Sequence, residues 1–155
     1  MIFLNKNKFL AGLFWLLSVI VMVLIFMFSA ATGDESEAVS QNLLDKIIEF
    51  IGNFISHNTL RKLAHFSEFA VLGFCVSGAI RYTFGKQKFY VPLIPCFLYA
   101  VSDEVHQHFV PERACRVFDI FVDTCGVMTG IGIFILLIFI ISKIIMEKEQ
   151  CVRGC

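Results

Sequence analysis

The sequence predicts an all-α integral membrane protein with four transmembrane helices and a short amphipathic helix on the outer surface. Of its 155 residues, 57% are hydrophobic, and the mean hydropathy is +0.77. Only 17% of the residues are charged, whereas about 25% are charged in typical soluble domains. Ionisable residues gather at the ends of the long apolar segments. A chain of this length holds about four spans and little else.

We predict spans at about residues 9–31, 60–80, 89–108 and 118–145. The first has no charged residue and is long enough to cross about 30 Å of hydrocarbon as a helix. A cleaved signal peptide is the alternative, since lysines precede this segment and Ser29-Ala30-Ala31 ends it. Because the apolar run is longer than a typical signal-peptide core, an uncleaved helix is favoured.

The other three spans are apolar with polar ends. Leu63 to Ile80 is apolar except for His65 and Glu68, and Phe89 to Ser102 is apolar but short. The last apolar run, Gly126 to Ser142, reaches the length of a span once its flanking turns are added.

The basic residues predict the topology. Eight of the thirteen fall on one side of the four spans: Lys6, Lys8, Arg81, Lys86, Lys88, Lys143, Lys148 and Arg153. The positive-inside rule assigns that side to the cytoplasm, so both termini of this multi-pass protein are predicted to be cytoplasmic. Eleven of the thirteen acidic residues then fall on the outer side or at the outward ends of the spans. The polar ends are therefore predicted to face outward.

The first outer loop contains a predicted amphipathic helix at about residues 39–56. Its apolar residues recur at intervals of three and four, from Val39 to Ile55, with polar residues between them. Such a helix lies in the headgroup plane or packs on the outer ends of the spans, and the pattern fits both arrangements.

Helical spacing predicts one polar stripe near the outer end of each of the last three spans. The stripes consist of Arg61, His65 and Glu68; of Asp103 or Glu104 with Gln107; and of Asp119 and Asp123, which continue into Gly126 and Gly130. Ionised groups in hydrocarbon are costly, so they pair, line a wet cavity or mark a functional site. We therefore predict that the three stripes form one site.

Gly126 and Gly130 form a small-xxx-small element that lets another helix approach closely. Packing within the bundle is the simplest use of this element, and it brings Asp119 and Asp123 near a neighbouring helix. A second copy of the chain is the other partner that such a glycine face fits, which gives a homo-oligomer.

Three ordered motifs resemble the VanZ-like family of small bacterial membrane proteins. They are Arg61-Lys62-Leu63-Ala64-His65-Phe66-Ser67-Glu68-Phe69, then Ser102-Asp103-Glu104-Val105-His106-Gln107-His108-Phe109-Val110-Pro111-Glu112-Arg113, then Asp119-Ile120-Phe121-Val122-Asp123-Thr124-Cys125-Gly126 with Gly130. The resemblance implies a single VanZ-like domain over residues 1–155 in the bacterial cell membrane. Two positions depart from the family pattern: Glu112 stands where Gly is frequent, and Asp123 where many members have Asn.

The resemblance also implies a role in susceptibility to teicoplanin, a lipoglycopeptide antibiotic, or in a related process of the cell envelope. The predicted ligand is a membrane lipid or lipid-linked cell-wall precursor. We expect Arg61, Lys62, Gln107 and Arg113 to bind its anionic headgroup, because arginine binds two oxygens at once.

The alternative is a membrane-embedded enzyme, acid-base or metal-assisted, that acts on a lipid-linked cell-envelope substrate. Carboxyl groups near basic residues can be held in different protonation states, as acid-base catalysis requires. The candidate catalytic residues are His65, Glu68, Asp103, Glu104, Asp119 and Asp123. In a purely structural alternative, the charged residues only stabilise the helix bundle through ion pairs, His65 with Glu68 and Arg113 with Asp119.

Metals, cofactors, nucleic acids and disulfides are not part of the predicted function. Histidine and carboxylates are metal ligands, but no compact metalloenzyme motif is present, and we predict neither a metal nor a cofactor. No nucleotide-binding loop appears, and a net charge of zero argues against nucleic acid as a partner. No disulfide is assigned to the six cysteines.

Overall fold

The computed structural model describes residues 2–31, 57–85, 88–111 and 117–153, which form four helices. Their bounds are Ile2–Ala30 for α1, His57–Phe84 for α3, Tyr90–His108 for α4 and Val117–Arg153 for α5. The prediction of an all-helical protein is confirmed. The predicted amphipathic helix at about 39–56 lies outside the described residues.

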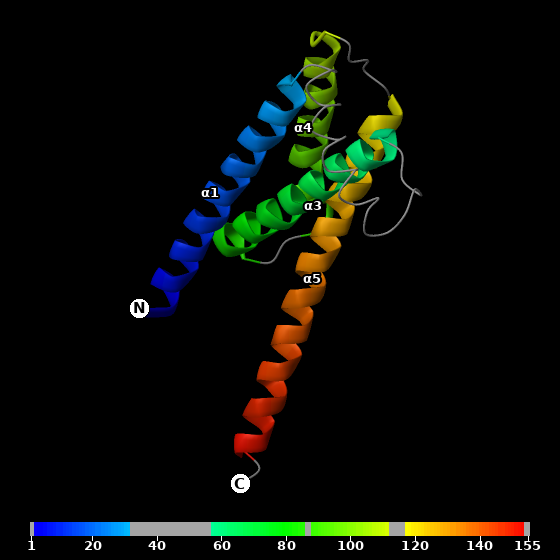
Figure 1. Ribbon diagram of the computed structural model, residues 1–155. Helices are drawn as coiled ribbons and strands as arrows, with labels where there is room; N and C mark the ends of the chain where they lie inside the picture. Colours follow the sequence, from blue (N-terminus) through cyan, green and yellow to red (C-terminus); the bar gives the residue numbers. More distant parts are fainter. Residues whose placement is uncertain (1, 32–56, 86–87, 112–116, 154–155) are drawn as a thin grey trace, which may run out of the picture.

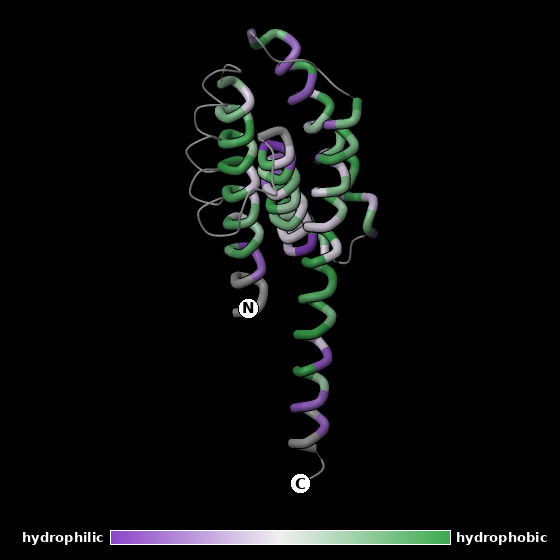
Figure 2. The backbone as a smooth tube through the Cα atoms, turned by 45° about the vertical axis from the view of Figure 1, so that its right-hand side comes forward, coloured by the Kyte–Doolittle hydropathy of each residue, from purple (hydrophilic) through white to green (hydrophobic). Residues whose placement is uncertain are grey.

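Three of the four helices are long and apolar enough to cross a membrane. These stretches are Asn7–Ala30, Thr59–Phe84 and Val117–Lys148, which correspond to three of the predicted spans. The helix α4 has the predicted position but is not among them; it has 19 residues, and its last two turns contain Asp103, Glu104 and Gln107. Figure 2 shows the apolar colouring along α1 and the middle of α5, with hydrophilic residues toward the ends of the bundle.

The helices alternate in direction. In Figure 1, α1 and α4 run upward and α3 and α5 run downward, so α1 begins below the polar end and α5 extends farthest down. The end of α1 and the end of α4 therefore share the upper end of the molecule with the beginnings of α3 and α5. This alternation brings polar residues that are far apart in the sequence to one end.

The central element is α3, which packs against each of the other three helices. Two glycines of α5 contact its backbone directly: a Cβ atom on Gly126 would overlap the carbonyl oxygen of Phe66, and one on Gly130 would overlap that of Ala70. Gly73 of α3 lies equally close to the backbone of Val127. Small residues on both helices thus permit a close crossing, as is common in membrane proteins.

Aromatic and aliphatic side chains fill the space between the helices. Phe14 of α1 contacts Phe74, Tyr82 and Phe134, with ring centroids 5.7 to 6.2 Å apart. Nearer the polar end, Ile25, Phe69, Leu72 and Val127 belong to a fully buried core cluster. This packing fixes the rotation of each helix and so decides which side chains meet at the upper end.

The end of α3 and the end of α4 are each defined by local chemistry. Gly85 has φ of +84°, and its N–H donates to the carbonyl of Arg81 at 2.9 Å, which closes α3. The N–H groups of Phe109 and Val110 donate to the carbonyls of His106 and Gln107, and Pro111 follows. Because proline cannot continue the hydrogen-bond ladder, α4 ends with Gln107 still inside the bundle.

Candidate functional site

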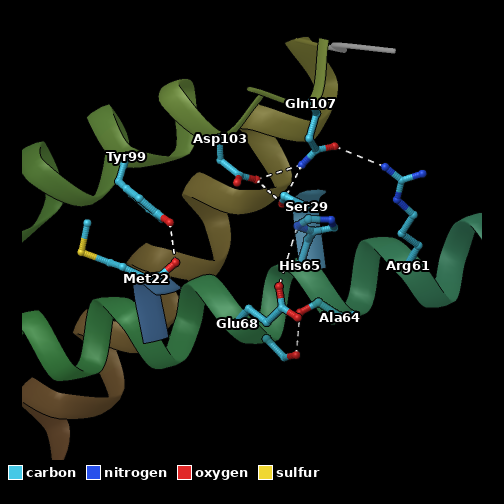
Figure 3. Close-up of polar contacts among 10 residues, drawn as sticks. Met22, Ser29, Arg61, Ala64, His65, Glu68, Tyr99, Asp103 and Gln107 are labelled. Carbon is cyan, nitrogen blue, oxygen red and sulfur yellow. Dashed lines mark hydrogen bonds and ion pairs between the residues drawn. The ribbon is translucent and has the colours of Figure 1, made fainter. Parts of the chain in front are cut away.

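A buried hydrogen-bond network joins α1 to α4 at the upper end of the bundle. The hydroxyl of Ser29 donates to Asp103 Oδ2 at 2.8 Å, and the amide of Gln107 donates to the same oxygen at 2.8 Å. The amide nitrogen of Gln107 also lies 3.1 Å from the Ser29 hydroxyl. Figure 3 shows these three side chains pointing toward one another. The carboxylate of Asp103 is thereby held by two donors in a place that water does not reach.

The same glutamine connects the network to α3. A guanidinium nitrogen of Arg61 donates to Gln107 Oε1 at 3.2 Å (Figure 3). Gln107 therefore uses its carbonyl oxygen toward Arg61 and its amide nitrogen toward Asp103 and Ser29, which fixes the orientation of the amide group. This arrangement confirms the prediction that Asp103 and Gln107 share one face of their helix.

A second contact links α3 to α5 closer to the surface. The ammonium of Lys62 lies 3.0 Å from Asp119 Oδ1 and 4.3 Å from the centroid of the Phe118 ring. The side chains of Lys62 and Asp119 are 35% and 26% exposed. The helix α5 thus offers an ammonium group both a carboxylate and the face of an aromatic ring.

His65 and Glu68 lie one turn deeper along α3. The imidazole Nδ1 of His65 and the carboxylate Oε2 of Glu68 are 3.9 Å apart, and both side chains are largely shielded from solvent. Glu104 of α4 is 2% exposed and faces the same region from another helix. Acidic groups of α3, α4 and α5 are therefore neighbours at this end of the bundle. Glu104 and Asp123 are buried, and Glu68 is partly exposed.

Asp123 is the least satisfied polar residue of the site. It is 1% exposed, and neither of its carboxylate oxygens has a hydrogen-bond partner among the residues that the structure describes. The charges of four other carboxylates act on it: Asp103, Glu104, Asp119 and Glu68. A buried carboxylate without donors is costly, so Asp123 stands out from the paired groups around it.

Nine of the ten predicted site residues lie in described helices at this end of the bundle. They are Arg61, Lys62, His65, Glu68, Asp103, Glu104, Gln107, Asp119 and Asp123. Arg113 lies outside the described residues. The structural alternative paired it with Asp119, but the partner of Asp119 within the described helices is Lys62. The expected contact between His65 and Glu68 is present at 3.9 Å.

Ser29 was absent from the predicted site, although it is fully buried and donates to Asp103. The sequence suggested instead that Ser29 belonged to a terminal stretch of small residues at the end of a span. A lone serine in an apolar helix has no stripe around it, so its partner becomes apparent only when α1 is packed against α4.

Metal ligation has little geometric support in the described helices. Within residues 2–31, 57–85, 88–111 and 117–153, no group of three or more His, Cys, Asp or Glu side chains is arranged to hold a metal ion. The chemistry that the arrangement does offer is hydrogen bonding, charge pairing and proton transfer among carboxylates, an imidazole and two cationic side chains.

A family model described as VanZ/LLP1 matches residues 14–139 of the chain, well over half of its length. The match contains all three sequence motifs and every residue of the candidate site, including Arg113. The resemblance inferred from the sequence is therefore confirmed. No curated protein and no solved structure matches the chain.

Proposed function

Since the chain belongs to the VanZ/LLP1 family, we propose that it binds the anionic headgroup of a membrane lipid or a lipid-linked cell-wall precursor at the polar end of its helix bundle. Through this ligand it affects susceptibility to lipoglycopeptides such as teicoplanin, or a related process of the bacterial envelope. The single observation that carries the proposal is the convergence of polar side chains from four helices at one end of an otherwise apolar bundle.

The proposal includes a four-span topology with α4 as the third span and both termini in the cytoplasm. The helices α1 and α5 both have their free ends directed downward in Figure 1. The basic residues Lys8, Arg81, Lys88 and Lys143 stand near the start of α1, at the end of α3, just before α4 and in the second half of α5. The positive-inside rule then directs the polar end outward. A headgroup in the outer leaflet is at the right level to reach it.

Arg61 and Lys62 are the groups proposed to contact the anionic part of the ligand. Both retain hydrogen-bond donors beyond those used by Gln107 and Asp119, because a guanidinium has five donors and an ammonium three. Both are also partly exposed, unlike the buried carboxylates of Asp103, Glu104 and Asp123. Arg113, which stands four residues before the first residue of α5 in the sequence, is proposed to join them.

Antibiotic susceptibility tests this function directly. We expect production of the protein in a teicoplanin-susceptible bacterium to raise the inhibitory concentration of teicoplanin, and Arg61→Gln to abolish the rise. Arg81→Gln is the matched control, since it removes the same charge from the opposite end of α3. The comparison is valid when both variants are present in the membrane in equal amounts. A full teicoplanin effect in the Arg61→Gln variant would exclude this residue from the function.

The alternative is an enzyme that uses these carboxylates as acid and base. The specific observation that favours it is the contrast between Asp103, which accepts two hydrogen bonds, and Asp123, which has no donor among the described residues. Two carboxyl groups in such different surroundings differ in proton affinity, as acid-base pairs require. Incubating the purified protein with lipid-linked precursors and analysing the products by mass spectrometry separates binding from turnover.

A further inference from the structure

Among the residues that the structure describes, no side chain or backbone group donates a hydrogen bond to Asp123. Its two carboxylate oxygens are buried, and no donor among the described residues reaches them. An ionised carboxylate accepts hydrogen bonds and cannot donate them. The missing partner must therefore bring N–H or O–H groups, and the four acidic neighbours favour one with a positive charge.

The contacts of α5 show where this carboxylate is directed. Four residues earlier, Asp119 meets Lys62 of α3, and three residues later, Gly126 meets the backbone of Phe66. Residues at such spacings share one face of a helix. Asp123 therefore faces α3 between Lys62 and Phe66, at the level of the buried acidic groups.

Lys62 shows which chemistry this face of α5 accepts. Its ammonium is bound by the carboxylate of Asp119 at 3.0 Å and stands over the ring of Phe118 at 4.3 Å. Asp123 repeats the carboxylate about 6 Å farther along the helix axis, since four residues rise by 1.5 Å each. The first carboxylate thus holds an ammonium from the chain itself, whereas the second one has none among the described residues.

The cationic side chains of the described helices nearest to Asp123 are directed elsewhere. Lys62 contacts Asp119, and Arg61 donates to Gln107 on α4. A metal ion fits poorly, because within the described helices no three ligating side chains are suitably grouped. A primary ammonium needs no such coordination geometry and brings three donors.

We propose that Asp123 binds a primary ammonium group belonging to the same headgroup whose anionic part contacts Arg61 and Lys62. This inference rests on the proposed function and narrows the ligand to a zwitterionic amphiphile, in which a phosphate and an amine are separated by a few atoms. The ammonium reaches Asp123 when the partly exposed Lys62 and Asp119 side chains move apart. Phosphatidylethanolamine is the simplest lipid with this headgroup.

Lipid retention by the purified full chain tests the proposal. The protein is equilibrated with mixed micelles containing equal amounts of phosphatidylethanolamine, phosphatidylcholine and phosphatidylglycerol, and the bound lipid is identified by native mass spectrometry. We expect phosphatidylethanolamine to be enriched roughly tenfold, the factor that one charged hydrogen bond provides. Phosphatidylcholine has a cation without N–H donors, and phosphatidylglycerol has hydroxyl donors without a cation, so both should be retained weakly.

The decisive variant is Asp123→Asn, which keeps the size of the side chain and removes its charge. It should lose the enrichment, whereas Glu147→Gln, a similar change at an exposed position of the same helix, should keep it. In lipid-free detergent, Asp123→Asn should melt no lower than the natural protein, because it removes a buried charge without a donor. A lower melting temperature would reveal a partner within the chain and overturn the proposal.

Other outcomes separate this inference from the proposed function. If phosphatidylglycerol is retained as well as phosphatidylethanolamine, and Arg61→Gln weakens both, the anionic site stands and the ammonium site is overturned. If Arg61→Gln changes no retention while Asp123→Asn abolishes that of phosphatidylethanolamine, the ammonium site stands and the anionic site fails. Competition with free phosphoethanolamine shows whether the protein recognises the headgroup alone or the whole lipid. Free phosphoethanolamine displaces the lipid only if the headgroup alone is recognised.

Discussion

Gly130 of α5 lies so close to Ala70 of α3 that a methyl group on the glycine would overlap the alanine carbonyl oxygen. Gly126 stands in the same relation to Phe66 one turn nearer the polar end. These contacts set the distance and the rotation between the two helices that carry Lys62, His65, Asp119 and Asp123. The glycine face expected to suit a neighbouring helix is thus used within the chain, and a homo-oligomer stays a prediction.

The close crossing predicts a strong difference between two neighbouring glycines. Gly130→Val should destabilise the protein by about 3 kcal/mol or more, because it drives a side chain into the backbone of α3. Gly132→Val is the matched control, since a Cβ atom at that position meets nothing within 4 Å. Thermal unfolding in detergent compares the two, and equal melting temperatures would contradict the α3–α5 crossing.

The topology predicts a difference in accessibility across the membrane. Single cysteines placed at Ser36 and Gln87, in a protein whose six natural cysteines have been replaced, should react differently with an impermeant thiol reagent. The first should be labelled on intact cells and the second only after lysis, because the positive-inside rule predicts a cytoplasmic position for the loop that contains Gln87. Equal labelling of both cysteines on intact cells would contradict the predicted outward orientation of the site.

Substitutions at Glu104 and Arg113 distinguish a functional site from a structural one. If the residues serve a ligand, Glu104→Gln and Arg113→Lys should abolish the teicoplanin phenotype while membrane abundance and melting temperature remain nearly unchanged. Both changes keep the approximate size and hydrogen-bonding capacity of the side chain. A purely structural role predicts a different pattern, because breaking a buried ion pair costs about 3 to 5 kcal/mol. Protein levels that fall together with activity would identify that role.

The metal content of the purified protein separates headgroup binding from metal-assisted chemistry. We expect elemental analysis to find no metal in stoichiometric amount. If a metal were bound through the imidazole and the carboxylates, His65→Gln and Asp123→Asn would both remove it, because a ligating imidazole is not replaced by an amide. A stoichiometric metal lost in both variants would favour a hydrolase or transferase over a binding protein.

The sequence alone was sufficient for the helices and for the chemical character of the site. The apolar runs were long enough to specify membrane helices, and their polar ends marked nine described residues that the structure gathers at one end. The faces within a helix were also predictable, as the bond from Gln107 to Asp103 shows. Helix length and spacing follow from local geometry, which depends only on residues close in the sequence.

The pairing between helices was decided by the tertiary structure. Asp119 meets Lys62, Asp103 accepts from Ser29, and Asp123 is left without a donor among the described residues. The three carboxylates have the same chemistry, so their spacing in the sequence does not predict which of them acquires a partner. Their partners depend on the crossing and rotation of α1, α3 and α5, which the backbone contacts at Gly126 and Gly130 and the packing of the core determine. Such contacts join residues far apart in the sequence, so local sequence patterns do not predict them.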